Sequence, residues 1–82
     1  MTQIIYFGRL GDVSGQFSEA CDIPSEVQTV KDLRTWLDEK YSDDGAFSEN
    51  TVRVALDNRI ADDQSLLTNV GEIALMPPVG GG

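Results

Sequence analysis

One segment of this 82-residue chain has the apolar spacing of an amphipathic helix, and strand-like segments lie on both sides of it. Thr29 and Asp32 stand where the two polar residues of a helix capping box are expected, with aspartate in place of the usual glutamate. The apolar residues that follow predict a stripe that faces a core. They are Val30, Leu33, Trp36, Leu37 and Tyr41. Because a chain of this length has room for one core and one sheet, the sheet is expected to pack on this helix.

Four segments have the composition and spacing of β-strands. They are residues 4–7, 17–23, 52–57 and 72–76. The first is a continuous apolar run, which is expected of a central strand buried on both faces. The third has the cleanest alternation of apolar and polar residues. Turns are expected at residues 8–15, 42–45 and 57–59, and a short buried turn at residues 66–67.

The predicted order is strand, strand, helix, strand, a short connection and strand. We therefore expect an α+β fold in which a mixed sheet packs on one main helix. Sequential hairpins form its outer pairs, and the right-handed crossover rule sets the hand of the parallel connection. This is the ubiquitin-like β-grasp layout. We expect residues 1–76 to form that domain and residues 77–82 to form a flexible C-terminal tail.

The charge balance of the chain bears on its partners and its compartment. Fourteen acidic residues against six basic ones give a net charge of -8. Such a surface repels phosphate groups, so we expect neither nucleic acid nor an anionic membrane as a partner. No apolar run is as long as a membrane span, and the first residues lack the pattern of a signal peptide. The single Cys21 cannot form an internal disulfide, which fits a cytoplasmic location.

The residues of the usual catalytic and metal sites are missing from the sequence. There is no histidine, which excludes Ser-His and Cys-His nucleophile pairs and, with one cysteine, ordinary zinc sites. The adjacent acids at residues 43–44 and 62–63 are expected to be solvated surface, so we predict no metal and no bound cofactor. Cys21 is predicted to be a small buried side chain, and Trp36 to belong to the core. We therefore expect the chain not to be catalytic alone.

The segment from Pro77 to Gly82 reads Pro-Pro-Val-Gly-Gly-Gly. Two prolines favour an extended path, and three glycines add no side chains, so the segment suits a narrow site. Extended, six residues reach roughly 20 Å. The alternative is a terminus without a role, and strand-like residues 72–76 running directly into the prolines argue against it. By elimination, the carboxylate of Gly82 is the expected reactive group.

The tail and the order of elements together resemble a known family, the small subunit of molybdopterin synthase, which is a β-grasp sulfur carrier. The family pattern Pro-Pro-Val-x-Gly-Gly matches residues 77–82 with Gly80 as x, and residues 4–15 are similar to the family's opening segment. A terminal Gly-Gly is shared with other ubiquitin-like carriers, whereas Pro-Pro separates this family from carriers of the thiamin pathway. The chain departs from the pattern at Gly11, where the family often has a basic residue, and at Leu75-Met76, where it often has aromatics.

The resemblance implies a cycle in three steps. An ATP-dependent activating enzyme adenylates the carboxylate of Gly82, so that ATP belongs to that enzyme and not to this chain. A sulfur donor protein then replaces AMP and leaves a thiocarboxylate. The carrier finally docks on the large, catalytic subunit of the synthase, in an expected heterotetramer, where its sulfur builds the dithiolene of molybdopterin from a cyclic pyranopterin precursor.

Ordering a flexible tail costs free energy, which contacts of the globular domain with its partners must offset. We expect partner contacts from Phe7, Arg9, Leu75 and Met76, on the exposed sheet face near the tail. The flexible thioether of a methionine suits a surface that meets more than one partner. The tail itself is expected to comprise Pro77, Pro78, Val79, Gly80 and Gly81, with the chemistry on Gly82.

Other functions remain open at this point. The chain has the features of a sulfur carrier for thiamin synthesis or tRNA thiolation, and of a ubiquitin-like modifier that forms an isopeptide bond with lysine. A non-covalent β-grasp interaction module, whose glycines have no role, is the remaining class.

Overall fold

The computed structural model describes residues 1–41 and 44–78 of the chain. Part of the turn predicted at 42–45, and the predicted tail residues Val79 to Gly82, lie outside these ranges. The elements are β1 (Thr2–Tyr6), α1 (Arg9–Ser14), β2 (Ser18–Cys21), α2 (Val30–Tyr41), β3 (Arg53–Leu56), β4 (Arg59–Ala61) and β5 (Glu72–Met76).

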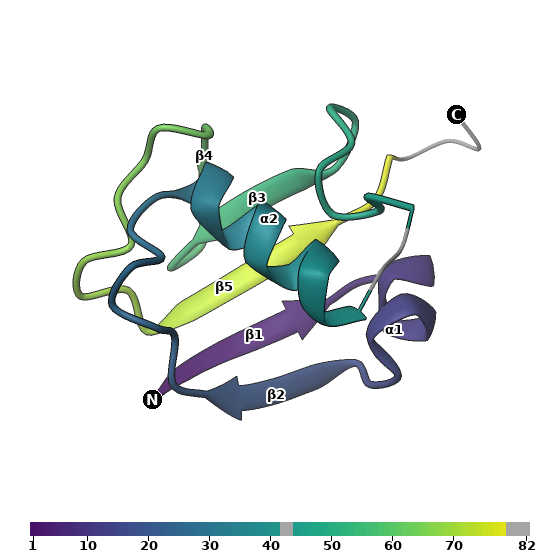
Figure 1. Cartoon of the computed structure of the whole chain (residues 1–82), viewed down its shortest axis with the longest axis horizontal. Helices are drawn as coiled ribbons and strands as arrows, with labels where there is room; N and C mark the ends of the chain where they lie inside the picture. Colours follow the sequence, from purple (N-terminus) through teal and green to yellow (C-terminus); the bar gives the residue numbers. More distant parts are fainter. Residues whose placement is uncertain (42–43, 79–82) are drawn as a thin grey trace.

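The strands form one mixed sheet in the order β2-β1-β5-β3-β4, and α2 lies across one of its faces (Figure 1). The central strands β1 and β5 are parallel, while β1–β2, β3–β4 and β3–β5 are antiparallel. The predicted mixed sheet on one main helix is confirmed, and it has the β-grasp arrangement.

The capping box predicted at the start of α2 is present. The backbone N–H of Asp32 donates to Thr29 Oγ1 (3.1 Å), and the N–H of Thr29 donates to Asp32 Oδ2 (3.2 Å). These two bonds satisfy backbone donors that the first turn of a helix leaves without partners. The helix therefore begins where its sequence predicts.

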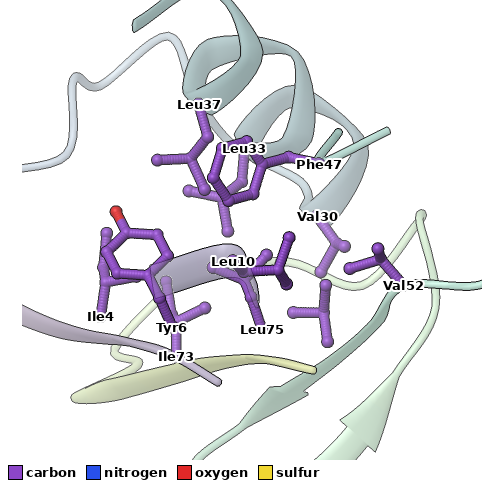
Figure 2. Packing of buried hydrophobic residues seen from close by; sticks show 11 residues of the cluster. Ile4, Tyr6, Leu10, Val30, Leu33, Leu37, Phe47, Val52, Ile73 and Leu75 are labelled. Carbon is purple, nitrogen blue, oxygen red and sulfur yellow. The ribbon is translucent and has the colours of Figure 1, made fainter. Parts of the chain in front are cut away.

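The core lies between α2 and the sheet face that α2 covers. Figure 2 shows Leu33 and Leu37 of the helix pointing toward Ile4 and Tyr6 of β1. Because side chains alternate along a strand, every second residue of β1, β3 and β5 enters this core. Its buried members are Ile4, Tyr6, Leu10, Val30, Leu33, Leu37, Phe47, Val52, Val54, Ile73 and Leu75.

The prediction that the first strand is buried on both faces is wrong. In β1 only alternate residues are fully buried, and Phe7, directly after the strand, is 48% exposed. The reason is that α2 covers one face of the sheet and leaves the other to solvent. The apolar run is nevertheless used, because it supplies the open face with apolar side chains.

Two short elements were not predicted. Residues 8–15, expected as a turn, contain the six-residue helix α1, which buries Leu10 and ends at Gly15 in the left-handed conformation. Asp57 and Asn58, both at positive φ, form the predicted turn, but it leads into a further strand, β4. Elements of six and three residues are too short to show a repeat. Leu66, expected to be buried, is 63% exposed.

A polar cluster joins β1, β2 and the end of α2. The carboxylate of Glu19 accepts hydrogen bonds from the hydroxyls of Tyr6 (2.7 Å) and Tyr41 (2.6 Å) and from Nε2 of Gln16 (2.8 Å). Lys40 Nζ lies 3.7 Å from its other oxygen. Burial favours the neutral acid, but the hydrogen bonds from the two tyrosines and the charge of Lys40 outweigh it, so the pKa of Glu19 lies below its usual range. Burial and the neighbouring carboxylate raise the pKa of both tyrosines, which keeps them protonated donors.

We predict that Glu19→Gln lowers the free energy of unfolding at pH 7 by about 1–3 kcal/mol, because the substitution replaces charge-assisted hydrogen bonds with neutral ones. The pKa of Glu19 is lower in the folded chain than in the unfolded chain. The stabilisation is therefore complete above the unfolded-state pKa, about 4.3, and is lost as the pH falls through the folded-state pKa.

Urea denaturation of both proteins between acid and neutral pH measures this difference. The gap between wild type and Glu19→Gln should narrow as the pH falls. Glu39→Gln, on the exposed surface of α2, is the matched control and should leave the curve close to wild type. A gap that is constant over the whole range would contradict the role assigned to the carboxylate.

Candidate functional site at the carboxyl ends of β1 and β5

The parallel pairing of β1 and β5 brings the ends of the first and last strands to the same edge of the sheet (Figure 1). Tyr6 is in register with Leu75, and the N–H of Phe7 donates to the carbonyl of Leu75 (2.9 Å). The residues that follow each strand are therefore neighbours. Pro77, the first residue of the predicted tail, lies beside the junction between β1 and α1.

Pro77 packs directly on Gly8. A Cβ built on Gly8 would lie 2.9 Å from Cγ of the proline ring, closer than real Cβ contacts. Gly8 also has φ 54°, a conformation that residues with side chains rarely adopt. The first residue of the tail thus packs on the backbone of Gly8, between β1 and α1.

The open face of the sheet, which we call the outer face, consists of the strand residues that point away from α2. A row of apolar residues crosses it: Ile5 is in register with Ala74, Ala74 with Ala55, and Ala55 with Ile60. Ile60 is 63% exposed. Of the two alanines in the middle of this row, Ala55 is only 8% exposed and Ala74 is half-buried, so the exposed apolar surface comes mainly from the larger side chains around them. The outer face is an apolar surface of the kind that protein partners cover.

Charge is almost absent from the outer face, although the chain carries fourteen acidic residues. Its strand residues include one acid, Glu72, and one base, Arg53, which forms no ion pair within the described part of the chain. A partner that covers this face therefore desolvates few carboxylates, which is the costly step in burying an acidic surface. The members of the outer face are Gln3, Ile5, Ser18, Ala20, Arg53, Ala55, Ile60, Glu72, Ala74 and Met76.

The structure brings most of the predicted contact residues together at the tail end of the sheet. Phe7 is exposed, Met76 is half-buried on the outer face beside Arg53, and Arg9 is exposed on α1 with an ion pair to Glu49 (3.4 Å). Pro77 and Pro78 are half-buried. The predicted residues Val79, Gly80, Gly81 and Gly82 lie outside the described residues.

The prediction that Leu75 contacts a partner is wrong. The side chain of Leu75 is fully buried in the core. Alternation along β5 places it on the side of Ile73, opposite Met76. Its side chain anchors the strand, and the apolar contact surface at this point belongs to its neighbours.

Gly11, where the resembled family often has a basic residue, is covered by an aromatic ring. A Cβ at Gly11 would lie 2.5 Å from Cδ1 of Phe17, whose side chain is 70% exposed. The ring thus takes the space into which a side chain at this position would project. The sequence did not reveal this pairing, since Phe17 was expected to begin a strand face and residues 8–15 were expected to be a turn.

Gly8, Arg53 and Ile60 were missed as members of the site. Their positions depend on the register between β1, β5, β3 and β4, which local sequence patterns do not contain. The glycine at a predicted turn and the alternation around Val54 were the available signals, and neither indicates which strand lies beside it.

Cys21 ends β2 and is partly buried. Burial and the charge of Glu19 raise the pKa of its thiol, and the opposing effect of Lys40 is smaller. Within residues 1–41 and 44–78, no group of acidic, cysteine or histidine side chains is placed to hold a metal ion, and no helix there is long and apolar enough to cross a membrane.

We predict that the thiol of Cys21 reacts slowly with iodoacetamide in the folded protein. The thiolate is the reactive form, and a raised pKa lowers its fraction at neutral pH. The pH at which alkylation reaches half its maximum rate should therefore lie higher in the folded chain than in the same chain in urea. An equal midpoint would contradict the raised pKa, and a lower midpoint in the folded chain would show an activated thiol and contradict a structural role.

Comparisons with known proteins agree with this architecture. The profile of the ThiS family matches residues 4–82, and the chain belongs to this family of β-grasp sulfur carriers. No curated protein matches the sequence significantly.

Two solved structures have the same fold. The crystal structure of SAMP1 from Haloferax volcanii is 25% identical, with a TM-score of 0.73 over 99% of this chain and 98% of that one. A putative molybdopterin converting factor, subunit 1, from Pyrococcus furiosus is 20% identical, with a TM-score of 0.75 over 95% of this chain and 97% of that one.

Proposed function

We propose that this member of the ThiS family is the small, sulfur-carrying subunit of a molybdopterin synthase. The carboxylate of Gly82 is adenylated, converted to a thiocarboxylate, and donates its sulfur to a cyclic pyranopterin precursor during molybdenum cofactor biosynthesis. The observation that carries the proposal is the packing of Pro77 on Gly8 at the end of β5. This packing holds the first residue of the segment Pro-Pro-Val-Gly-Gly-Gly in place beside the apolar row of the outer face.

The chemistry follows from the weakness of a carboxylate as an electrophile. A carboxylate oxygen of Gly82 attacks the α-phosphorus of ATP, and pyrophosphate leaves. A sulfur nucleophile, in the simplest case sulfide, then attacks the acyl carbon; the C–S bond forms, and AMP leaves with the electrons of the C–O bond. Glycine has no Cβ to obstruct this carbon. The pocket, the base and the nucleotide site belong to the activating enzyme, so the chain contributes the acyl group and its delivery.

The partners of this cycle meet the same end of the molecule. We place the docking of the large synthase subunit, in a heterotetramer, and of the adenylating enzyme on the outer face and on Phe7. A sulfur donor protein supplies the second step. Ordering the tail costs roughly 1–2 kcal/mol per residue, which apolar burial on the outer face offsets. We place the cycle in the cytoplasm, where a reducing environment keeps Cys21 a free thiol.

A second candidate shares the activation step and differs in the fate of the acyl group. A ubiquitin-like modifier passes its terminal glycine to a lysine amine, and a carrier of another pathway passes sulfur to a different acceptor. The likeness to SAMP1 and to a molybdopterin converting factor subunit leaves the acceptor to experiment. A non-covalent interaction module would tolerate an extension beyond Gly82 without loss of activity.

We predict that Gly82 becomes a thiocarboxylate. The protein is incubated with the activating enzyme of its own source, ATP and sulfide, and its intact mass is measured. Exchange of one oxygen for one sulfur at the C-terminus is the expected result. The same reaction with Cys21→Ala removes the other sulfur nucleophile of the chain, so that a thiol-reactive probe then labels the thiocarboxylate alone. If the mass stays unchanged with every activating enzyme tested, the proposal that this chain is a sulfur carrier is wrong.

Docking and chemistry should separate by mutation. Deleting Gly81-Gly82 should abolish sulfur transfer and leave affinity for the large subunit within about threefold, because the outer face supplies most of the contact. Met76→Glu should weaken binding by at least about 10-fold, since a partner would then bury the new carboxylate together with its cross-strand neighbour Arg53. Phe7→Glu places a charge at the exposed position after β1 and should weaken binding to the large subunit in the same way.

Titration calorimetry of each variant against the large subunit measures the affinities, and melting curves check the fold. Thr35→Glu, on the exposed surface of α2, adds the same charge away from the outer face and is the control. If the tail deletion weakened binding as much as Met76→Glu, the division between docking and chemistry would be wrong.

A further inference from the structure

Gly8 and Pro77 meet at a contact that allows no side chain on the glycine. The proline Cγ lies 2.9 Å, and its Cδ 3.7 Å, from the point where a Cβ would stand. Carbon atoms in good contact lie about 3.5–4.0 Å apart. An alanine at position 8 therefore moves the proline ring, or the backbone beneath it, by a large part of an ångström.

The backbone around Gly8 is held on both sides and cannot easily move away. Before it, the N–H of Phe7 donates to the carbonyl of Leu75 (2.9 Å). After it, the N–H groups of Leu10 and Gly11 donate to the carbonyls of Phe7 and Gly8 (both 3.1 Å), which starts α1. The glycine is thus fixed between a strand and a helix, with φ 54° and ψ -135°.

Pro77 follows the last paired residue of β5. The pairing of β5 with β3 ends at Met76, opposite Arg53. A proline has no N–H, so it cannot extend the ladder of hydrogen bonds. Packing on Gly8 therefore contributes to the position of this ring where the strand ladder no longer does.

We propose that Gly8 is a positioning residue for acyl transfer. Pro77 packs on the backbone of Gly8, and this contact helps to set the direction in which the tail enters a partner's site. This inference rests on the proposed function. Gly8 contacts neither the acyl group nor a substrate, and acts through Pro77 alone. A change in where the tail begins alters the set of positions from which Gly82 can be presented to a partner's site, and a misplacement of about 1 Å at a reacting atom can cost on the order of 100-fold in rate.

The test is the activation step, measured as ATP–pyrophosphate exchange by the purified activating enzyme over a range of carrier concentrations. Gly8→Ala should lower kcat by at least about 10-fold and leave KM within about twofold, because the docking surface is intact. Gly15→Ala is the matched control: Gly15 ends the same helix at φ 81°, but a Cβ there meets nothing within 4 Å. It controls for placing a side chain at a positive φ at an end of α1, in the left-handed region and without the collision, and should retain kcat.

A double-mutant cycle isolates the contact. Pro77→Ala removes the ring atoms that a Cβ at position 8 meets, so adding Gly8→Ala to it should cost little further activity. Pro77→Ala alone should lower kcat, while Pro78→Ala should not to the same extent, since only the first proline meets Gly8. These two single variants decide the question even if Gly8→Ala does not fold, which a melting curve reveals.

The outcomes are distinct. Wild-type kcat in Gly8→Ala, equal losses in Gly8→Ala and Gly15→Ala, or equal losses in the two proline variants would each overturn the role of Gly8 and leave the proposed function standing. Absence of exchange with the wild-type carrier would overturn the proposed function and this inference with it.

Discussion

The parallel pairing of β1 with β5 is the interaction on which the rest of the structure depends. Parallel strands cannot be joined by a tight turn, so both helices and the three other strands are built between them. The pairing also places the ends of the first and last strands at one edge, where Phe7 and Gly8 lie beside Met76 and Pro77. This register thus decides which residues of the N-terminal segment lie beside the start of the tail.

The distribution of charge follows the same architecture. Asp32 caps α2, Glu19 is held inside by Tyr6 and Tyr41, and Asp63 pairs with Arg34 at the side of the helix. The outer face is left with one acid among its strand residues. A chain of net charge -8 thus repels other acidic surfaces over most of its area and keeps one apolar face for contact.

Local signals in the sequence predicted the elements that are long or capped. The Thr29–Asp32 box and the stripe after it defined α2, and alternation defined β5. The same alternation puts Ile73 and Leu75 on one face of the strand and Met76 on the other, so Leu75 and Met76 could not both face a partner. Helix α1 and strand β4 were too short to recognise, and the contact between Gly8 and Pro77 joins opposite ends of the chain, which no local pattern encodes.

The central claim is that the outer face is the docking surface from which the tail is delivered. Methyl cross-saturation NMR tests it directly, with the carrier labelled at its methyl groups and bound to its unlabelled activating enzyme. The account predicts loss of signal at Ile5, Ile60 and Met76, and little change at the methyl group of Thr35, which is exposed on α2. Saturation along α2, with the outer-face methyls unaffected, would contradict it.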